Sequence, residues 1–245
     1  MIAFLTSSPG GIRLEDGEMK ACALDESNGF VEKLKSHWKG TFRCLLLSSD
    51  PEGTEGNDQV AEMMGQAFAM TGLGVSEFAV CDRRRSQISR EELHAYDLLI
   101  LAGGHVPTEH AFYEELELRE KIKGYPGMIL GISAGTMNSA ALVYAQPELP
   151  GESLDQNDQR FLPGLGLTEV MILPHYQEIK HHTLDGKRVM EDITYPDSMG
   201  RRFYALVDGS YLYIENGRER IFGEAYAIEN GSIRKICGQG EEYIL

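Results

Sequence analysis

The stretch GMILGISAGTMN, residues 127–138, places a short apolar run directly before the pattern Gly-x-Ser-x-Gly. An apolar run of this length beside glycine is typical of a buried β-strand, and the TMNSAALVYA segment that follows predicts a helix. A serine at a sharp strand-to-helix turn is the arrangement of a nucleophile elbow, whose small neighbours let strand and helix approach each other. The stretch therefore predicts an α/β fold and marks Ser133 as a candidate nucleophile.

Similar apolar runs recur through the first 175 residues. They are continuous rather than alternating, which suits parallel strands that are covered on both faces. They lie at residues 2–6, 42–49, 75–81, 97–104, 128–133 and 168–173, and helical patterns fall between them at residues 28–38, 57–72, 89–96 and 107–124. This alternation predicts a doubly wound, mainly parallel sheet flanked by helices.

The pattern changes from about residue 203. The segment is rich in Tyr, Ile and Val, with Asp-Gly at 208–209 and Asn-Gly at 216–217 and 230–231. These dipeptides are typical of tight hairpin turns and predict an antiparallel β section. Since no long linker precedes it, we expect one domain over residues 1–245 that ends in this hairpin-rich part.

Composition excludes several classes of partner. The formal net charge is −15, whereas binding to nucleic acid or to an anionic membrane surface needs clustered Lys and Arg. The basic cluster at 83–85 is interpreted as a solvated loop. No apolar run approaches the ~18 residues of a membrane span, and the four cysteines, Cys22, Cys44, Cys81 and Cys237, are scattered. We expect a cytoplasmic monomer or homodimer.

Two further elements fit the chemistry of a serine nucleophile. Gly103-Gly104 ends a predicted strand, so the Gly104 N–H is a candidate oxyanion donor together with the N–H of Ala134. His175 follows another predicted strand, where it could act as the base at the same edge of the sheet.

The orienting carboxylate stays open at this point. Acidic residues between Ser133 and His175 include Glu148, Glu152, Asp155 and Asp158, and spacing does not choose among them. His175, Glu178 and His182 have roughly helical spacing, which is an alternative metal-site pattern, but no further ligand set is evident. We expect no metal and no organic cofactor.

Four landmarks occur in order: LILAGGHV (99–106), GISAG (131–135), ILPHY (172–176) and ALVDGSYLYIENGRERIFG (205–223). With these the chain resembles the peptidase E and cyanophycinase family of serine hydrolases. The resemblance implies a class I glutamine amidotransferase-like (flavodoxin-like) fold with serine in place of the nucleophilic cysteine.

The resemblance also implies roles for residues. It places a Ser–His–acid triad on Ser133, His175 and, about fifteen residues after the serine, Glu148. His105 stands where peptidase E has an asparagine, and the Gly-Glu-Thr-Arg segment that follows the family's histidine is missing. The candidate substrate contacts are therefore His105 and, for a substrate carboxylate, Lys187 or Arg188.

The expected function is hydrolysis of a small peptide or peptide-like amide through an acyl-enzyme. An ester or other acyl hydrolase with the same triad is the first alternative. A catalytically idle scaffold that binds a small ligand is the second.

Overall fold

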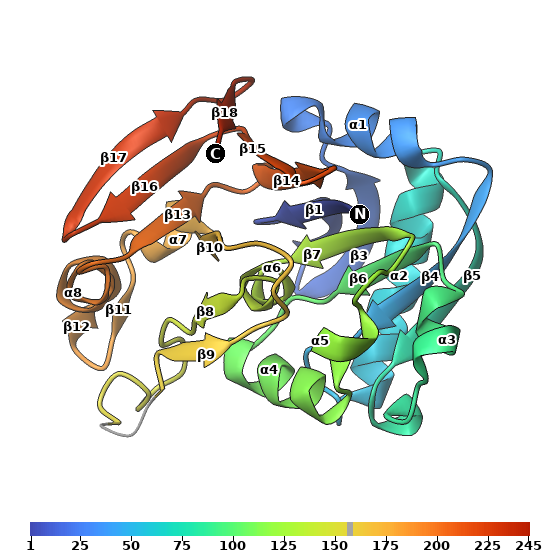
Figure 1. The fold of residues 1–245 in the computed structure, drawn as a ribbon, viewed down its shortest axis with the longest axis horizontal. Coiled ribbons are helices and arrows are strands. Elements are labelled where there is room, and N and C mark those ends of the chain that lie inside the picture. Colours follow the sequence, from blue (N-terminus) through green and yellow to red (C-terminus); the bar gives the residue numbers. More distant parts are fainter. Residues whose placement is uncertain (156–158) are drawn as a thin grey trace.

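An eight-stranded sheet forms the centre of the computed structural model, which describes residues 1–155 and 159–245 (Figure 1). Its order is β18-β15-β14-β1-β7-β6-β4-β5. The strands are β1 (Ile2–Thr6), β4 (Thr41–Leu47), β5 (Gly74–Cys81), β6 (Leu98–Leu101), β7 (Met128–Ile132), β14 (Tyr211–Glu215), β15 (Arg218–Phe222) and β18 (Glu242–Ile244).

The middle of this sheet is parallel, as predicted. β1 pairs with β7, β7 with β6, β6 with β4, and β4 with β5, all in parallel register. β14, β15 and β18 extend the sheet on the other side of β1 with antiparallel pairs. The predicted fold class, a mainly parallel sheet between helices with an antiparallel C-terminal section, is confirmed.

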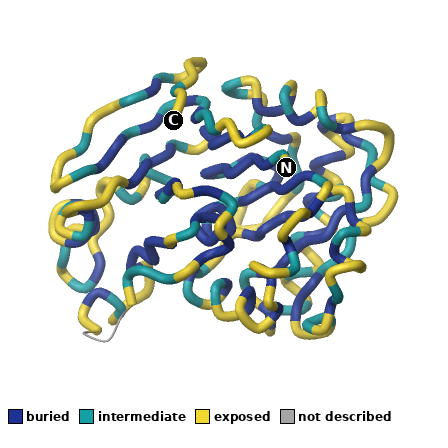
Figure 2. The backbone as a smooth tube through the Cα atoms, in the orientation of Figure 1, coloured by how far each residue is buried: buried dark blue, intermediate teal, exposed yellow. Residues whose placement is uncertain are grey.

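Helices cover both faces because the central strands are apolar on both faces. α1 (Phe30–His37) and α2 (Thr54–Met70) contribute to one core cluster, and α3 (Arg90–His94), α4 (Val106–Glu115) and α5 (Leu118–Lys121) to another. A capping box begins α3, since Ser89 and Glu92 exchange side-chain and backbone hydrogen bonds. In Figure 2 the strands between these layers are almost continuously buried.

A second sheet lies beside the first, in orange to red at the left of Figure 1. Its order is β10-β13-β16-β17. The strands are β10 (Met171–Leu173), β13 (Arg202–Leu206), β16 (Ala225–Glu229) and β17 (Ser232–Cys237). The expectation that residues 168–173 extend the main sheet is wrong, because β1 already has β7 on one side and β14 on the other. β10 instead pairs in parallel with β13.

One predicted hairpin is also wrong. Both Asn-Gly turns close hairpins, β14–β15 and β16–β17. The Asp-Gly pair at 208–209 does not, because β13 belongs to the second sheet and β14 to the first. The turn therefore carries the chain from one sheet to the other.

Smaller elements complete the chain. They are β2 (Gly10–Glu15), β3 (Glu18–Leu24), β8 (Leu142–Tyr144), β9 (Phe161–Pro163), β11 (Thr183–Leu184), β12 (Lys187–Arg188), α6 (Ala134–Asn138), α7 (Tyr176–Ile179), α8 (Tyr195–Asp197), two 3₁₀ turns η1 (Ser27–Gly29) and η2 (Arg83–Arg85), and a π-helical turn η3 (Val189–Thr194). The β2–β3 and β8–β9 pairs were not predicted from the sequence.

Two predicted helices are shorter than expected. The helix at 107–124 is interrupted at Glu117, whose φ of 52° is left-handed and separates α4 from α5. The helix after Ser133 ends at Asn138, and the chain then enters β8. β-Branched and aromatic residues in LVY favour that strand.

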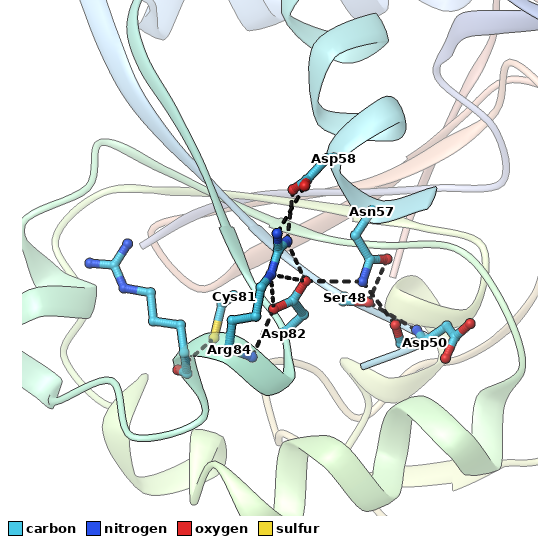
Figure 3. A network of polar contacts seen from close by, with 8 residues as sticks. Ser48, Asp50, Asn57, Asp58, Cys81, Asp82 and Arg84 are labelled. Atoms are coloured by element: carbon cyan, nitrogen blue, oxygen red, sulfur yellow. Dashed lines mark hydrogen bonds and ion pairs between the residues drawn. The ribbon is translucent and has the colours of Figure 1, made fainter. Parts of the chain in front are cut away.

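Two of the three arginines in the basic cluster after β5, Arg83 and Arg84, pair with neighbouring carboxylates. Arg84 bonds to Asp82 and Asp58, and Figure 3 shows it between them. Asn57 in turn bonds to Asp82 and to Ser48 at the end of β4. The cluster is thus part of an ion-pair network that joins β4, α2 and η2.

Among the described residues, no helix has the length and apolar character that crossing a membrane requires.

Gly135 offers a test of how tightly the elbow packs. A Cβ at this position would overlap the backbone carbonyl of Leu101 on β6. We expect Gly135→Ala to lower the free energy of unfolding by about 1–3 kcal/mol, measured by urea denaturation. Gly56→Ala in α2 is the control, since a Cβ there meets nothing, and alanine should stabilise that helix by up to about 1 kcal/mol. Equal effects of both variants would contradict the packing argument.

Candidate active site

Ser133 lies between β7 and α6 with strained backbone angles. Its φ of 49° and ψ of −109° are unusual for a residue with a side chain. Both glycines of the motif are required by space. A Cβ at Gly131 would lie 2.9 Å from Leu5 and Thr136 side-chain atoms, and one at Gly135 would meet β6. The predicted elbow geometry is present.

The end of β1 fixes this turn by hydrogen bonds. The Ser133 N–H and the Thr136 hydroxyl both donate to the Thr6 carbonyl, at 3.1 and 2.8 Å. The Thr6 hydroxyl donates to the Gly131 carbonyl at 2.8 Å. These three contacts are buried and hold Ser133 at the carboxyl edge of the parallel strands.

His175 contacts Ser133 and a carboxylate at the same time. Its Nε2 lies 2.9 Å from the Ser133 Oγ, and its Nδ1 lies 2.8 Å from the Asp208 Oδ1. His175 follows β10, and Asp208 follows its parallel neighbour β13. The carboxyl ends of strands from the two sheets therefore meet at this point.

Ser7, directly after β1, holds these two residues in place. Its buried hydroxyl donates to the Asp208 Oδ1 at 2.6 Å and accepts from the His175 backbone N–H at 2.8 Å. The His175 backbone needs this support because its φ is 56°, in the left-handed region.

The pKa values of His175 and Asp208 are both shifted by their surroundings. Burial disfavours the imidazolium, but the hydrogen bond and charge of Asp208 outweigh it, so the pKa of His175 is raised. Burial likewise disfavours the Asp208 carboxylate, but hydrogen bonds from His175 and Ser7 outweigh it and lower the pKa of Asp208. Asp208 is therefore an ionised partner that favours positive charge on His175.

The carboxylate that contacts the His175 Nδ1 belongs to Asp208, and not to Glu148 as the resemblance to peptidase E implies. Glu148 lines the hollow beside Ser133, and no hydrogen bond joins its carboxylate to His175 among the described residues. Glu152 accepts bonds from the Glu148 and Leu149 N–H groups and from His105. Asp158 lies outside the described residues.

Asp208 was missed for two reasons. The candidate acids lie between the serine and the histidine in the chain, whereas Asp208 follows both. Its Asp-Gly dipeptide was interpreted as a hairpin turn. An acid placed directly after a buried strand, FYAL at 203–206, is the signal that could have identified it.

The Gly103-Gly104 loop passes beside the nucleophile. A Cβ at Gly103 would be 3.3 Å from the Ser133 Cβ, and one at Gly104 would collide with Ser49. The Ser49 hydroxyl donates to the Gly103 carbonyl at 2.6 Å. Because a trans peptide points its N–H opposite to its carbonyl, this bond directs the Gly104 N–H away from Ser49. Ala134 begins α6 directly after Ser133.

The three candidate substrate contacts are engaged elsewhere. His105 bonds to Thr108 and to Glu152, each at 2.7 Å. The Lys187 ammonium donates to the Ser153 carbonyl at 2.6 Å, and Arg188 pairs with Asp192 at 2.7 Å. None of them lines the hollow beside Ser133.

The alternative metal pattern does not form a ligand group. Both nitrogens of His175 are hydrogen-bonded, to Ser133 and Asp208. Within residues 1–155 and 159–245, no group of three or more His, Cys, Asp or Glu side chains is arranged to hold a metal ion.

Comparison with known proteins shows the family of this chain. The sequence profile of peptidase family S51 matches residues 51–222, well over half of the chain. The chain belongs to peptidase family S51. This family membership confirms the resemblance to peptidase E and supports a serine peptidase-like hydrolase.

Solved structures share the fold of this S51 family member. A peptidase from an acI-B1 actinobacterium matches with a TM-score of 0.64 at 15% identity, over 100% of this chain and 96% of the other. A protein from Listeria monocytogenes EGD-e, named as a candidate peptidase E, matches with a TM-score of 0.55 at 14% identity, over 96% and 98%. A search of curated proteins finds no match.

A buried carboxyl group connects α4 to α6, the helix that follows the elbow. Glu109 is fully buried, and it accepts hydrogen bonds from Tyr113 at 2.6 Å and from the Asn138 amide at 2.8 Å. Burial raises its pKa from 4.5 to about 8, despite both donors. Glu109 therefore keeps its proton at neutral pH in the folded state and loses it in the unfolded state.

This difference makes stability depend on pH. At Glu109 the folded state binds one more proton than the unfolded state between pH 4.5 and about 8, so this group should make the free energy of unfolding fall as pH rises through that window, by up to roughly 1.4 kcal/mol per unit. Glu109→Gln should flatten this fall in urea denaturation series. Glu114→Gln, exposed on the same helix, should keep it. An unchanged slope in Glu109→Gln would show that the carboxyl is ionised when folded.

Proposed function

We propose that this S51 family member cleaves a small peptide or peptide-like amide through an acyl-enzyme on Ser133. The observation that carries the proposal is the continuous chain Ser133–His175–Asp208, with separations of 2.9 and 2.8 Å. A serine within hydrogen-bond reach of a base that a carboxylate orients is the arrangement of an activated nucleophile.

The tautomer follows from the partners. Ionised Asp208 only accepts hydrogen bonds, so the His175 Nδ1 carries a proton and the Nε2 is free to accept the Ser133 proton. As the Oγ attacks the carbonyl carbon, its proton passes to the Nε2. His175 then gives that proton to the leaving amine as the C–N bond breaks. Water repeats these steps to release the acid.

The negatively charged oxygen that forms during the attack must be stabilised by hydrogen-bond donors. The Ala134 N–H lies at the start of α6, directly beside the nucleophile, and has no hydrogen-bond partner among the described residues. The bond from the Ser49 hydroxyl to the Gly103 carbonyl directs the Gly104 N–H away from Ser49. Two backbone donors of this kind are worth a large part of the rate enhancement in acyl transfer.

An ester hydrolase with the same three residues remains the alternative activity, because the triad does not distinguish amide from ester carbonyls. A panel of matched amides and esters, compared by kcat/KM, separates the two.

Labelling of Ser133 tests the proposal against an idle scaffold. We expect a neutral fluorophosphonate to modify Ser133 in the folded protein, as shown by peptide mass mapping, and Ser133→Ala to abolish both labelling and hydrolysis. Ser139→Ala is the control, since its hydroxyl is buried and bonded to the Gly135 carbonyl. A folded wild-type protein whose Ser133 is not labelled would refute the proposal.

The shifted pKa of His175 predicts a pH profile. Its imidazole is the base only when neutral, so kcat/KM should rise with pH along a limb above the ordinary histidine pKa of 6.5. Asp208→Asn removes the charge that raises this pKa, so the limb should move to lower pH while kcat falls by roughly 10⁴. Glu148→Gln should lower kcat far less. If instead Glu148→Gln were the more damaging variant, the orienting role of Asp208 would be disproved.

A further inference from the structure

A hollow opens beside Ser133, on the side of α7. It has a volume of about 240 Å³, slightly below the roughly 300 Å³ at which pockets for drug-sized ligands begin. Met137, Ile179 and Val189 supply apolar walls. The space therefore suits one amino-acid side chain or the end of a short peptide.

Two acidic residues line this hollow. Glu148 lines it from the loop after β8, and Glu178 lines it from α7. Both residues are exposed, and within the described part of the chain neither carboxylate has a hydrogen-bond or ion-pair partner. Both charges act to raise the pKa of His175, so their field reaches the reacting centre. Partial desolvation by the surrounding walls raises the pKa of Glu148.

No lysine or arginine among the described residues balances this charge in the lining. The basic side chains there are the imidazoles of His175, which is bonded to Asp208, and His182. The cations nearby in the sequence, Lys187 and Arg188, bond to Ser153 and Asp192 instead. A carboxylate in the hollow would meet two like charges, whereas a cation would meet two unpaired partners.

We infer that the hollow binds a cationic group of the substrate, an ammonium or a guanidinium, between Glu148 and Glu178. The apolar walls take the methylene stem of that group, as they do for long basic side chains elsewhere. The group could be the side chain of a lysine or arginine residue or the free amine of a short peptide. This inference rests on the proposed function, since it assigns selectivity to the same nucleophile.

Charge-matched probes test the inference without knowledge of the natural substrate. Three fluorophosphonates of equal length carry a terminal trimethylammonium, a neutral tert-butyl or a carboxylate group. We expect the second-order rate of Ser133 labelling to be at least about tenfold higher for the cation than for the neutral probe, and lowest for the anion.

Two amide pairs then distinguish the source of the charge. Acetyl-arginine and acetyl-citrulline coumarin amides differ in the side-chain charge, and alanine and acetyl-alanine coumarin amides differ in the amine charge. An advantage for arginine over citrulline would assign the hollow to a basic side chain, and an advantage for free alanine would assign it to the amine. Either result supports the inference.

Variants connect the selectivity to the two carboxylates. Glu148→Gln and Glu178→Gln should each reduce the cation-to-neutral labelling ratio several-fold, and Glu148→Lys should invert it. Ratios are used because they cancel general effects on Ser133 reactivity. Glu91→Gln, exposed on α3 and outside the hollow, should leave the ratio unchanged.

The outcomes separate the two proposals. Labelling of Ser133 at equal rates by all three probes, or fastest by the anion, overturns the cation inference and leaves the serine hydrolase intact. The inference also fails if the ratio is high but insensitive to Glu148 and Glu178. Absence of labelling by every probe overturns the proposed function and the inference together.

Discussion

The buried hydroxyl of Ser7 joins the strand ends of the two larger sheets at the candidate active site. Ser7 directly follows β1 of the main sheet, and it bonds to the His175 backbone and to the Asp208 carboxylate, both of which follow strands of the second sheet. Ser133 belongs to the main sheet and is fixed to the same strand through Thr6. The nucleophile and its base thus come from different sheets, and the end of β1 sets their separation.

The arrangement of the main sheet could be predicted because its signals are local. Continuous apolar runs between helical patterns gave the parallel strands, and the strand–serine–helix order gave the elbow. Small residues at positions 131 and 135 have a steric reason that the sequence already indicated, since the turn leaves no room for a Cβ at either place. The pairing of β10 with β13 had no such signal, because pairing between distant segments depends on which edges the rest of the fold leaves open.

The dependence on distant segments also explains why the carboxylate that contacts His175 could not be predicted. Glu148 and Asp208 are both acids near the end of apolar segments, and the resemblance to peptidase E favoured the first. What decides between them is the direction in which each loop leaves its strand. β13 runs parallel to β10 in register, so the residues just beyond both strands emerge side by side, and Asp208 reaches the His175 Nδ1. The loop after β8 instead places Gln146, Pro147 and Glu148 in the lining of the hollow.

Placement of Glu148 in that lining has a consequence for the base. Three carboxylates act on His175: Asp208 by direct contact, and Glu178 and Glu148 through space. In the empty site all three favour the imidazolium, which cannot accept a proton from Ser133. A cation bound between Glu148 and Glu178 would offset two of these charges and lower the pKa of His175, while Asp208 continues to hold the ring. Filling the hollow would then also convert His175 towards the neutral form that attack by Ser133 requires, so that a substrate of the right charge promotes its own cleavage.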